Sequence, residues 1–91
     1  MNAYLFVFDR DSTTDYTALH EKIKSDTHIN NWWHYLNSAY ILISPFTANQ
    51  LSDSIRTYFP NRFLIIKISK NDYQGWLPET AWEWIRTNVN G

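Results

Sequence analysis

NNWWHYLNSAYILIS, residues 30–44, decides the fold because it has the pattern of two β-strands joined by a turn. The sequence predicts strands over Trp32–Leu36 and Ala39–Ser44, with the turn at Asn37-Ser38. Since side chains alternate along a strand, the adjacent Trp32 and Trp33 must point to opposite faces. The two indoles are therefore expected to seal two surfaces of a sheet and not to form one ligand-stacking platform.

The segments before this hairpin predict a further strand and a helix. The strand covers Asn2–Phe8, where both alternating sets of side chains are apolar, so both faces are expected to be buried. Ser12 followed by Asp15 has the spacing of a capping box and predicts a helix that runs to about Ser25.

The segments after the hairpin predict a helix, a strand and a final helix. Thr47 with Gln50 forms a second capping-box pattern, and Pro60-Asn61 ends that helix. A fourth strand is expected over Arg62–Ile68, and a last helix over Pro78–Val89. The order β-α-β-β-α-β predicts an α+β fold: one domain over residues 1–91, a ferredoxin-like split βαβ arrangement with a four-stranded antiparallel sheet, plus a C-terminal helix.

The second face of this sheet needs a cover, because two helices protect only one face and both faces are apolar. Either the terminal helix folds over that face or a second copy of the chain does. We expect a two-fold homodimer packed sheet to sheet, with Trp82, Trp84 or both at its edge.

Composition excludes several classes of function. The chain has no cysteine, which rules out disulfides, thiolate metal sites and a cysteine nucleophile. Its two glycines cannot supply a glycine-rich phosphate loop. No apolar run is long enough to cross a bilayer and no signal peptide is visible, so we expect a soluble, cytoplasmic protein with no membrane partner. The net charge of −1 disfavours long duplex DNA but leaves a small anionic ligand open.

Nearly the whole chain resembles small bacterial and phage proteins of the SinR-like family. The distinctive segments are WWHYLNS at residues 32–38 and GWLPETAWEWI at residues 75–85. That family is similar in fold to the small CRISPR adaptation subunit and to VapD-type toxins. The resemblance implies a ferredoxin-like homodimer, a metal-dependent nuclease activity and a catalytic Asp at the end of the first strand. Only Asp9 matches that position, and this chain lacks the basic surface of the adaptation subunits.

Asp9 leaves the first strand at its end, a usual place for functional groups. In a dimer, two copies of Asp9 can bind Mg²⁺ or Mn²⁺ through carboxylate oxygens, and the ion can activate water on a phosphodiester. Asp11 is a candidate further metal ligand, and Arg10 a candidate bidentate ligand for the phosphate. The alternative is that Asp9, Asp11 and Ser12 form a polar turn that caps the first helix.

His34 and Trp76 complete the candidate site. His34 is a candidate general acid or base, since histidine changes charge within the physiological pH range. The alternative, which the general burial of histidine favours, is a half-buried ring held by hydrogen bonds. Trp76 follows Gly75 in a predicted loop, where its indole can stack on a base or pin the last helix to the sheet.

Two functions from different classes follow from the sequence. The first is a homodimer that binds a nucleotide or short nucleic acid and cleaves its phosphodiester with Asp9 and a divalent ion. The second is a non-catalytic phage or mobile-element protein that binds a host protein or sequesters a signalling nucleotide. The second hypothesis rests on the near-neutral charge and the abundance of aromatic residues.

Overall fold

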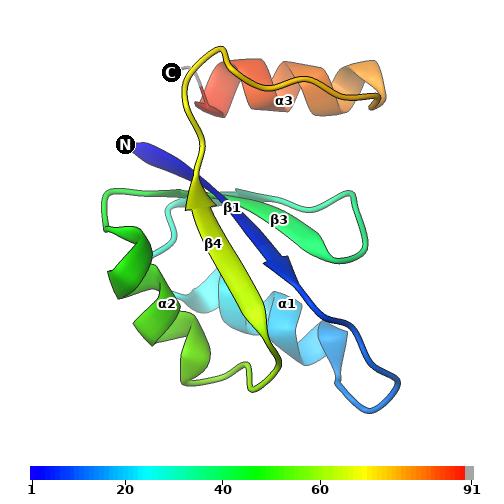
Figure 1. The fold of residues 1–91 in the computed structure, drawn as a ribbon, viewed down its shortest axis with the longest axis vertical. Coiled ribbons are helices and arrows are strands. Elements are labelled where there is room, and N and C mark those ends of the chain that lie inside the picture. The colour runs from blue at the N-terminus through cyan, green and yellow to red at the C-terminus, as the bar shows by residue number, and fades with distance from the viewer. Residues whose placement is uncertain (90–91) are drawn as a thin grey trace.

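The computed structural model describes residues 1–89 and contains four strands and three helices (Figure 1). The elements are β1 (Asn2–Phe8), α1 (Tyr16–Ser25), β2 (Asn31–Trp33), β3 (Ala39–Ser44), α2 (Ala48–Arg56), β4 (Phe63–Lys67) and α3 (Glu79–Val89). The α+β class is confirmed, and each predicted strand and helix is present. β1 has the predicted bounds, and β4 is one residue shorter at each end.

The strands form one antiparallel sheet in the order β2-β3-β1-β4. Phe6 in β1 lies opposite Tyr40 of β3 on one side and Ile65 of β4 on the other. β1 and β3 are thus the inner strands, and all six residues of β3 are buried. This position explains why both faces of these two strands are apolar.

The two internal helices begin at different kinds of cap. The capping box at Thr47 is confirmed: its side chain accepts from the Gln50 backbone N–H, and the Gln50 side chain accepts from the Thr47 N–H. The capping box at Ser12 is wrong. Asp15 is itself the N-cap of α1, and its carboxylate accepts from the Ala18 N–H at 3.0 Å. The sequence between β1 and Asp15 forms a loop instead.

The hairpin between β2 and β3 has a longer connection than the predicted two-residue turn. β2 ends at Trp33, and residues 34–38 form the loop. The reason is local: the His34 ring turns back onto the next strand, where its Nδ1 lies 2.9 Å from the Ala39 carbonyl oxygen. This contact takes His34 out of the strand pattern.

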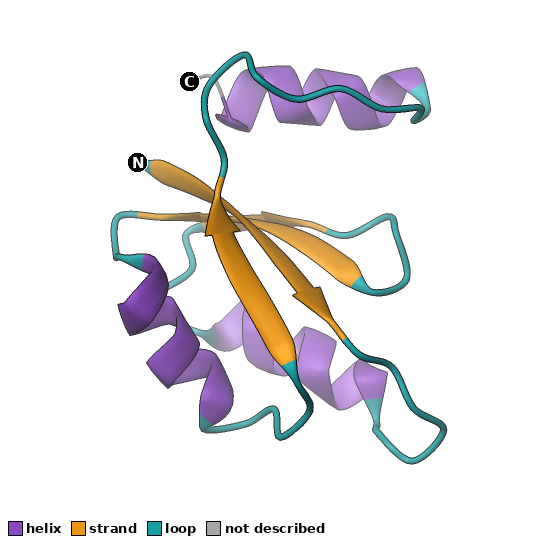
Figure 2. Cartoon of the chain, in the orientation of Figure 1, coloured by secondary structure: helices purple, strands orange, loops and turns teal. Residues whose placement is uncertain are grey.

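Helices α1 and α2 lie on one side of the sheet and α3 on the other (Figure 2). Buried apolar side chains form a separate core on each face. The first core lies between the sheet and helices α1 and α2, and Trp32 packs against it. The second lies between the opposite face and α3, and Trp33, Trp82 and Trp84 pack against it. The prediction that Trp32 and Trp33 point to opposite faces is therefore confirmed. The terminal helix covers part of the second face, which was one of the two expected covers.

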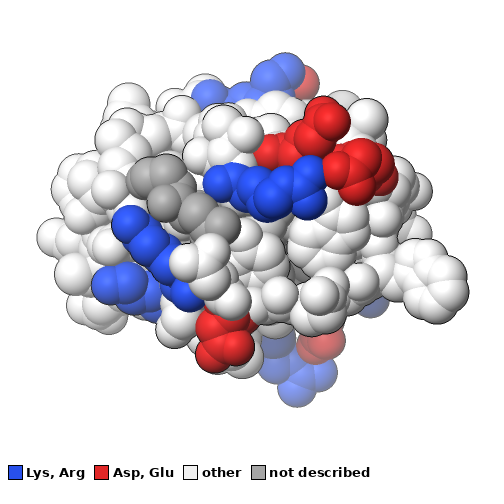
Figure 3. Space-filling view, turned by 90° about the horizontal axis from the view of Figure 1, so that it is seen from above, with Lys and Arg blue, Asp and Glu red and all other residues white. Residues whose placement is uncertain are grey.

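Part of the second face remains open beside α3. Leu64 and Ile66 of β4 are 55% and 50% exposed. On the α3 side of the molecule, charges of both signs are interspersed with uncharged surface and form no continuous basic patch (Figure 3). No helix within residues 1–89 combines the length and the apolar character that a membrane span requires.

Candidate functional site

A cavity of about 320 Å³ opens beside the end of β1, between α1 and the loop of residues 34–38. We call it the histidine pocket. Its polar lining consists of Arg10, Tyr16, Thr17, His20, His34, Asn37 and Tyr40. No carboxylate of residues 1–89 lines it, and three of these side chains, Arg10, His20 and His34, can carry positive charge. The lining therefore favours an anionic ligand.

His34 is held in one orientation on the wall of the histidine pocket. Because a carbonyl oxygen only accepts, the Nδ1 of His34 must donate to Ala39 O, at 2.9 Å. The ring stacks on Tyr40 with centroids 4.0 Å apart and planes 8° apart. The Nε2 atom has no hydrogen-bond partner among residues 1–89 and is available to a ligand. His34 is thus the half-buried, hydrogen-bonded ring of the alternative interpretation, and one of its nitrogen atoms stays open.

His20 lies on the neighbouring wall, one residue after the buried Leu19 of α1. Its Nδ1 lies 2.7 Å from the Tyr40 hydroxyl, and its ring meets the edge of Trp32 at a centroid distance of 4.7 Å. The His20 and His34 rings have centroids 6.1 Å apart. Burial raises the pKa of Tyr40 to about 12, although the Arg10 charge acts in the opposite direction. Tyr40 therefore keeps its proton and serves as a neutral partner for His20.

Arg10 closes the pocket from the loop that follows β1. Its guanidinium lies 3.9 Å above the centroid of the Tyr16 ring and donates to the Asn37 carbonyl oxygen. Tyr16 is fixed in turn, because its hydroxyl accepts from the Asp11 backbone N–H at 2.7 Å. The cation is held by an aromatic face and one hydrogen bond, which leaves further N–H groups for an anion.

Asp9 and Asp11 lie outside the histidine pocket and hold the loop between β1 and α1. The Asp9 carboxylate pairs with Arg62 at 3.2 Å, and both side chains are largely exposed. Asp11 accepts from the Thr13 and Thr14 backbone N–H groups at 3.0 and 2.8 Å. Hydrogen bonds from Thr14 and Thr13 hold the pKa of Asp11 below its usual value. Asp11 thus organises a polar turn, as in the alternative to a catalytic role, but Asp15 and not this turn caps α1.

The two carboxylates do not assemble a metal site within one chain. Nowhere in residues 1–89 do three His, Cys, Asp or Glu side chains gather closely enough to hold an ion. One Asp9 oxygen is already shared with Arg62, and Asp11 is occupied by loop N–H groups. Binding of Mg²⁺ or Mn²⁺ by Asp9 and Asp11 stays a prediction that requires ligands from a second copy.

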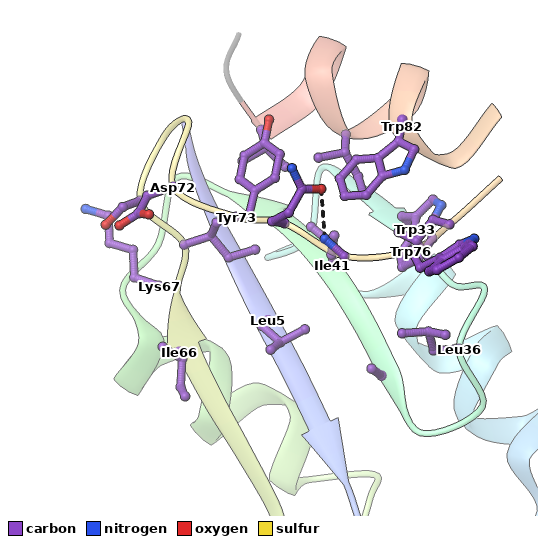
Figure 4. A pocket seen from close by; sticks show the side chains of 18 residues that line it. Leu5, Trp33, Leu36, Ile41, Ile66, Lys67, Asp72, Tyr73, Trp76 and Trp82 are labelled. Atoms are coloured by element: carbon purple, nitrogen blue, oxygen red, sulfur yellow. Dashed lines mark hydrogen bonds between the residues drawn. The ribbon is translucent and has the colours of Figure 1, made fainter. Parts of the chain in front are cut away.

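Trp76 lies on the opposite side of the sheet from the histidine pocket. It lines an apolar groove of about 530 Å³ between the second sheet face and the segment that leads into α3 (Figure 4). Trp76 is 99% exposed, so its indole does not pin the helix. Trp82 does so instead, since it packs against the second core. Trp76 and Arg10 therefore do not share a cavity.

The structure thus brings Arg10 and His34 together and separates them from Asp9, Asp11 and Trp76. Sequence reasoning missed His20, Tyr16 and Tyr40. One signal was available: Tyr16 and His20 are four residues apart and lie on the same face of α1. The contact from His20 to Tyr40 joins a helix to a strand 20 residues away, and no local pattern predicts it.

No family model, no curated protein and no solved structure matches this chain.

Proposed function

We propose that the histidine pocket binds a phosphodiester group of a nucleotide or short RNA. The observation that carries the proposal is the convergence of Arg10, His20 and His34 on one cavity without a carboxylate. Arginine suits phosphate because its planar N–H groups match two phosphate oxygens. The Tyr16 ring holds Arg10 and the Tyr40 ring holds His34 in place beside the cavity.

The size of the expected ligand follows from charge. The chain has 8 Lys and Arg residues against 9 Asp and Glu residues, a net charge of −1. Contacts with many phosphates require a basic stripe. A ligand that places only one or two phosphates in the histidine pocket needs no such stripe.

The fold supports two related proposals. Strand order β2-β3-β1-β4 with antiparallel neighbours, together with the β-α-β-β-α-β order along the chain, supports a ferredoxin-like split βαβ arrangement. We propose kinship with the SinR-like family on the segments quoted above, and with it a cytoplasmic location.

Arg10→Gln should weaken binding of a fluorescein-labelled hexaribonucleotide of mixed sequence by about 10–100-fold. This corresponds to the loss of one hydrogen-bonded charge, about 1.5–3 kcal/mol. Fluorescence anisotropy at fixed salt measures the affinity. Arg86→Gln is the matched control, because Arg86 lies on α3 and pairs there with Glu79. Its affinity should stay within about two-fold of the wild type, as is usual for a surface site away from a ligand.

Equal affinities for Arg10→Gln and the wild type would contradict the proposal. Parallel titrations in EDTA, in Mn²⁺ and with Asp9→Ala test the alternative from the sequence. Binding that requires the ion and Asp9 would favour a metal site shared between two copies. Binding that survives chelation and returns the RNA intact describes a sequestration protein that uses the same pocket.

We also propose a homodimer, for which the open edge of β4 gives the reason. Within residues 1–89, β4 pairs with β1 alone, so its other edge has unpaired backbone groups, and Leu64 and Ile66 are exposed beside it. A two-fold axis perpendicular to the sheet at this edge pairs the two β4 strands antiparallel and brings those side chains of the two copies together on one face. Because the net charge of the chain is only −1, electrostatic repulsion between two copies is weak.

Leu64→Glu with Ile66→Glu should halve the mass measured by sedimentation at micromolar concentration, because four carboxylates then meet at the two-fold axis. Lys24→Glu on α1 is the charge-changing control, and its mass should equal that of the wild type. A wild-type chain that sediments as a monomer would exclude the dimer.

A further inference from the structure

We propose that the histidine pocket cleaves RNA without a metal ion, with His34 as general base and His20 as general acid. The inference rests on the proposed phosphodiester binding and adds an activity and a substrate class. The main evidence is that each imidazole ring is fixed through its Nδ1 atom. His34 is held by the Ala39 carbonyl oxygen and His20 by the Tyr40 hydroxyl. Neither Nε2 has a hydrogen-bond partner within the described part of the chain.

The hydrogen bonds assign different roles to the two rings. His34 must donate from Nδ1 to the Ala39 carbonyl, so its neutral form has a lone pair on Nε2 and can accept a proton. As the imidazolium, His20 donates from Nδ1 to the Tyr40 hydroxyl oxygen and carries a second proton on Nε2, and it becomes a neutral imidazole when it gives that proton away. Tyr40 stays protonated in this arrangement because burial raises its pKa to about 12. The pocket is therefore lined by one fixed base and one fixed acid.

RNA supplies the nucleophile that this site lacks. His34 Nε2 removes the proton of a ribose 2′-hydroxyl, and that oxygen attacks the adjacent phosphorus. The bond from phosphorus to the 5′-oxygen breaks, and His20 Nε2 gives its proton to the leaving oxygen. The products are a 2′,3′-cyclic phosphate and a 5′-hydroxyl, so no water, metal ion or oxidant is consumed. Arg10 stabilises the charge that develops on the phosphate oxygens.

The spacing of the rings agrees with this role. Their centroids lie 6.1 Å apart on the wall of the same cavity, a separation that one phosphodiester group can span. Tyr40 contacts both rings, His34 by stacking and His20 by its hydroxyl. The pair is thus positioned by one buried side chain before any ligand arrives. Such preorganisation is what acid–base catalysis requires.

The test compares a hexaribonucleotide with the deoxyribonucleotide of the same base sequence, both in EDTA, with products identified by mass spectrometry. The RNA should be cleaved to 2′,3′-cyclic phosphate ends, and the DNA should bind but stay intact. His34→Asn keeps an amide donor for Ala39 O but has no Nε2, so cleavage should fall by about 10²–10⁴-fold. Its affinity for the RNA should change only a few-fold. His28→Asn, at the third histidine, which lies outside the pocket, should cleave at the wild-type rate.

The outcomes separate this inference from the proposed function. RNA that binds through Arg10 but is not cleaved overturns the inference and leaves the binding function. RNA that does not bind at all overturns both. Cleavage of the DNA strand, or cleavage that needs Mn²⁺, also overturns the inference, because neither uses a 2′-hydroxyl with two histidines.

Discussion

Phe6→Ala should destabilise the protein by about 3–5 kcal/mol, the usual cost of removing a fully buried aromatic ring. The Phe6 side chain has no exposed surface and lies on β1 at the centre of the first core. Four rings surround it with centroids 5.1–6.1 Å away: Phe8, Tyr40, Phe59 and Phe63. No single one of these neighbours can fill the space that the ring leaves.

Urea denaturation followed by circular dichroism measures this loss. Small domains have a total stability of about 5–15 kcal/mol, so this loss should move the urea midpoint to a clearly lower concentration. Lys67→Ala is the control on the neighbouring strand, because that side chain is exposed and its loss should cost less than about 0.5 kcal/mol. A loss below 1 kcal/mol for Phe6→Ala would mean that β1 is not central to the core.

Asp26→Ala should cost roughly 3 kcal/mol, because several groups lose a charged acceptor at once. The side chain of Asp26 is only 3% exposed and lies just after α1. Its oxygens accept from the His28 backbone N–H, the Ser54 hydroxyl and the Tyr58 hydroxyl. They also contact the His28 ring at 3.0 Å. This carboxylate thus ties the end of α1 to α2 at the bottom of the first core.

The effect of Asp26 should depend on pH with a defined sign. Burial acts to raise the pKa of Asp26, but the hydrogen bonds from His28, Ser54 and Tyr58 outweigh it, so the pKa lies below its usual 3.8. A lowered pKa in the folded state stabilises the protein above the usual carboxyl range and loses that effect as the pH falls.

The difference between wild type and Asp26→Ala should therefore be largest above about pH 5 and shrink as the pH falls below 3.8. Unfolding curves in urea across this range measure it. Asp53→Ala is the control, since Asp53 lies on the exposed side of α2. A difference that grows toward acid pH would contradict the assignment of Asp26 as a buried, ionised anchor.

Sequence reasoning located most elements because their signals are local. The alternation in Asn2–Phe8 and the capping box at Thr47 need no distant contact, and both appear where expected. The loop after Trp33 was missed because a ring contact, His34 to Ala39, overrides strand propensity there. The start of α1 was missed because Asp15 suits the N-cap itself as well as the third position of a capping box.

The candidate site was predicted only in part, and for the same reason. Arg10 and His34 were singled out by residue type and position, but their shared cavity depends on how the loop after β1 meets the hairpin. His20 belongs to the site because it hydrogen-bonds Tyr40, and this contact between a helix and a strand has no local signal in the sequence. The cover of the second sheet face could not be predicted, because alternating apolar residues show that a face is buried but not whether a helix or a second copy buries it. The structure assigns much of that role to α3.

Because a core lies on each face of the sheet, neither face of the inner strands tolerates substitution freely. In β1 and β3, Tyr4 and Leu42 belong to one core, while Ala3, Ile41 and Ile43 belong to the other. Almost any substitution in these strands disturbs close-packed neighbours, whereas β4 has exposed side chains at alternate positions. Sequence divergence among descendants of this chain should therefore be slow in the inner strands and accumulate in the outer strands and in the segment that leads to α3.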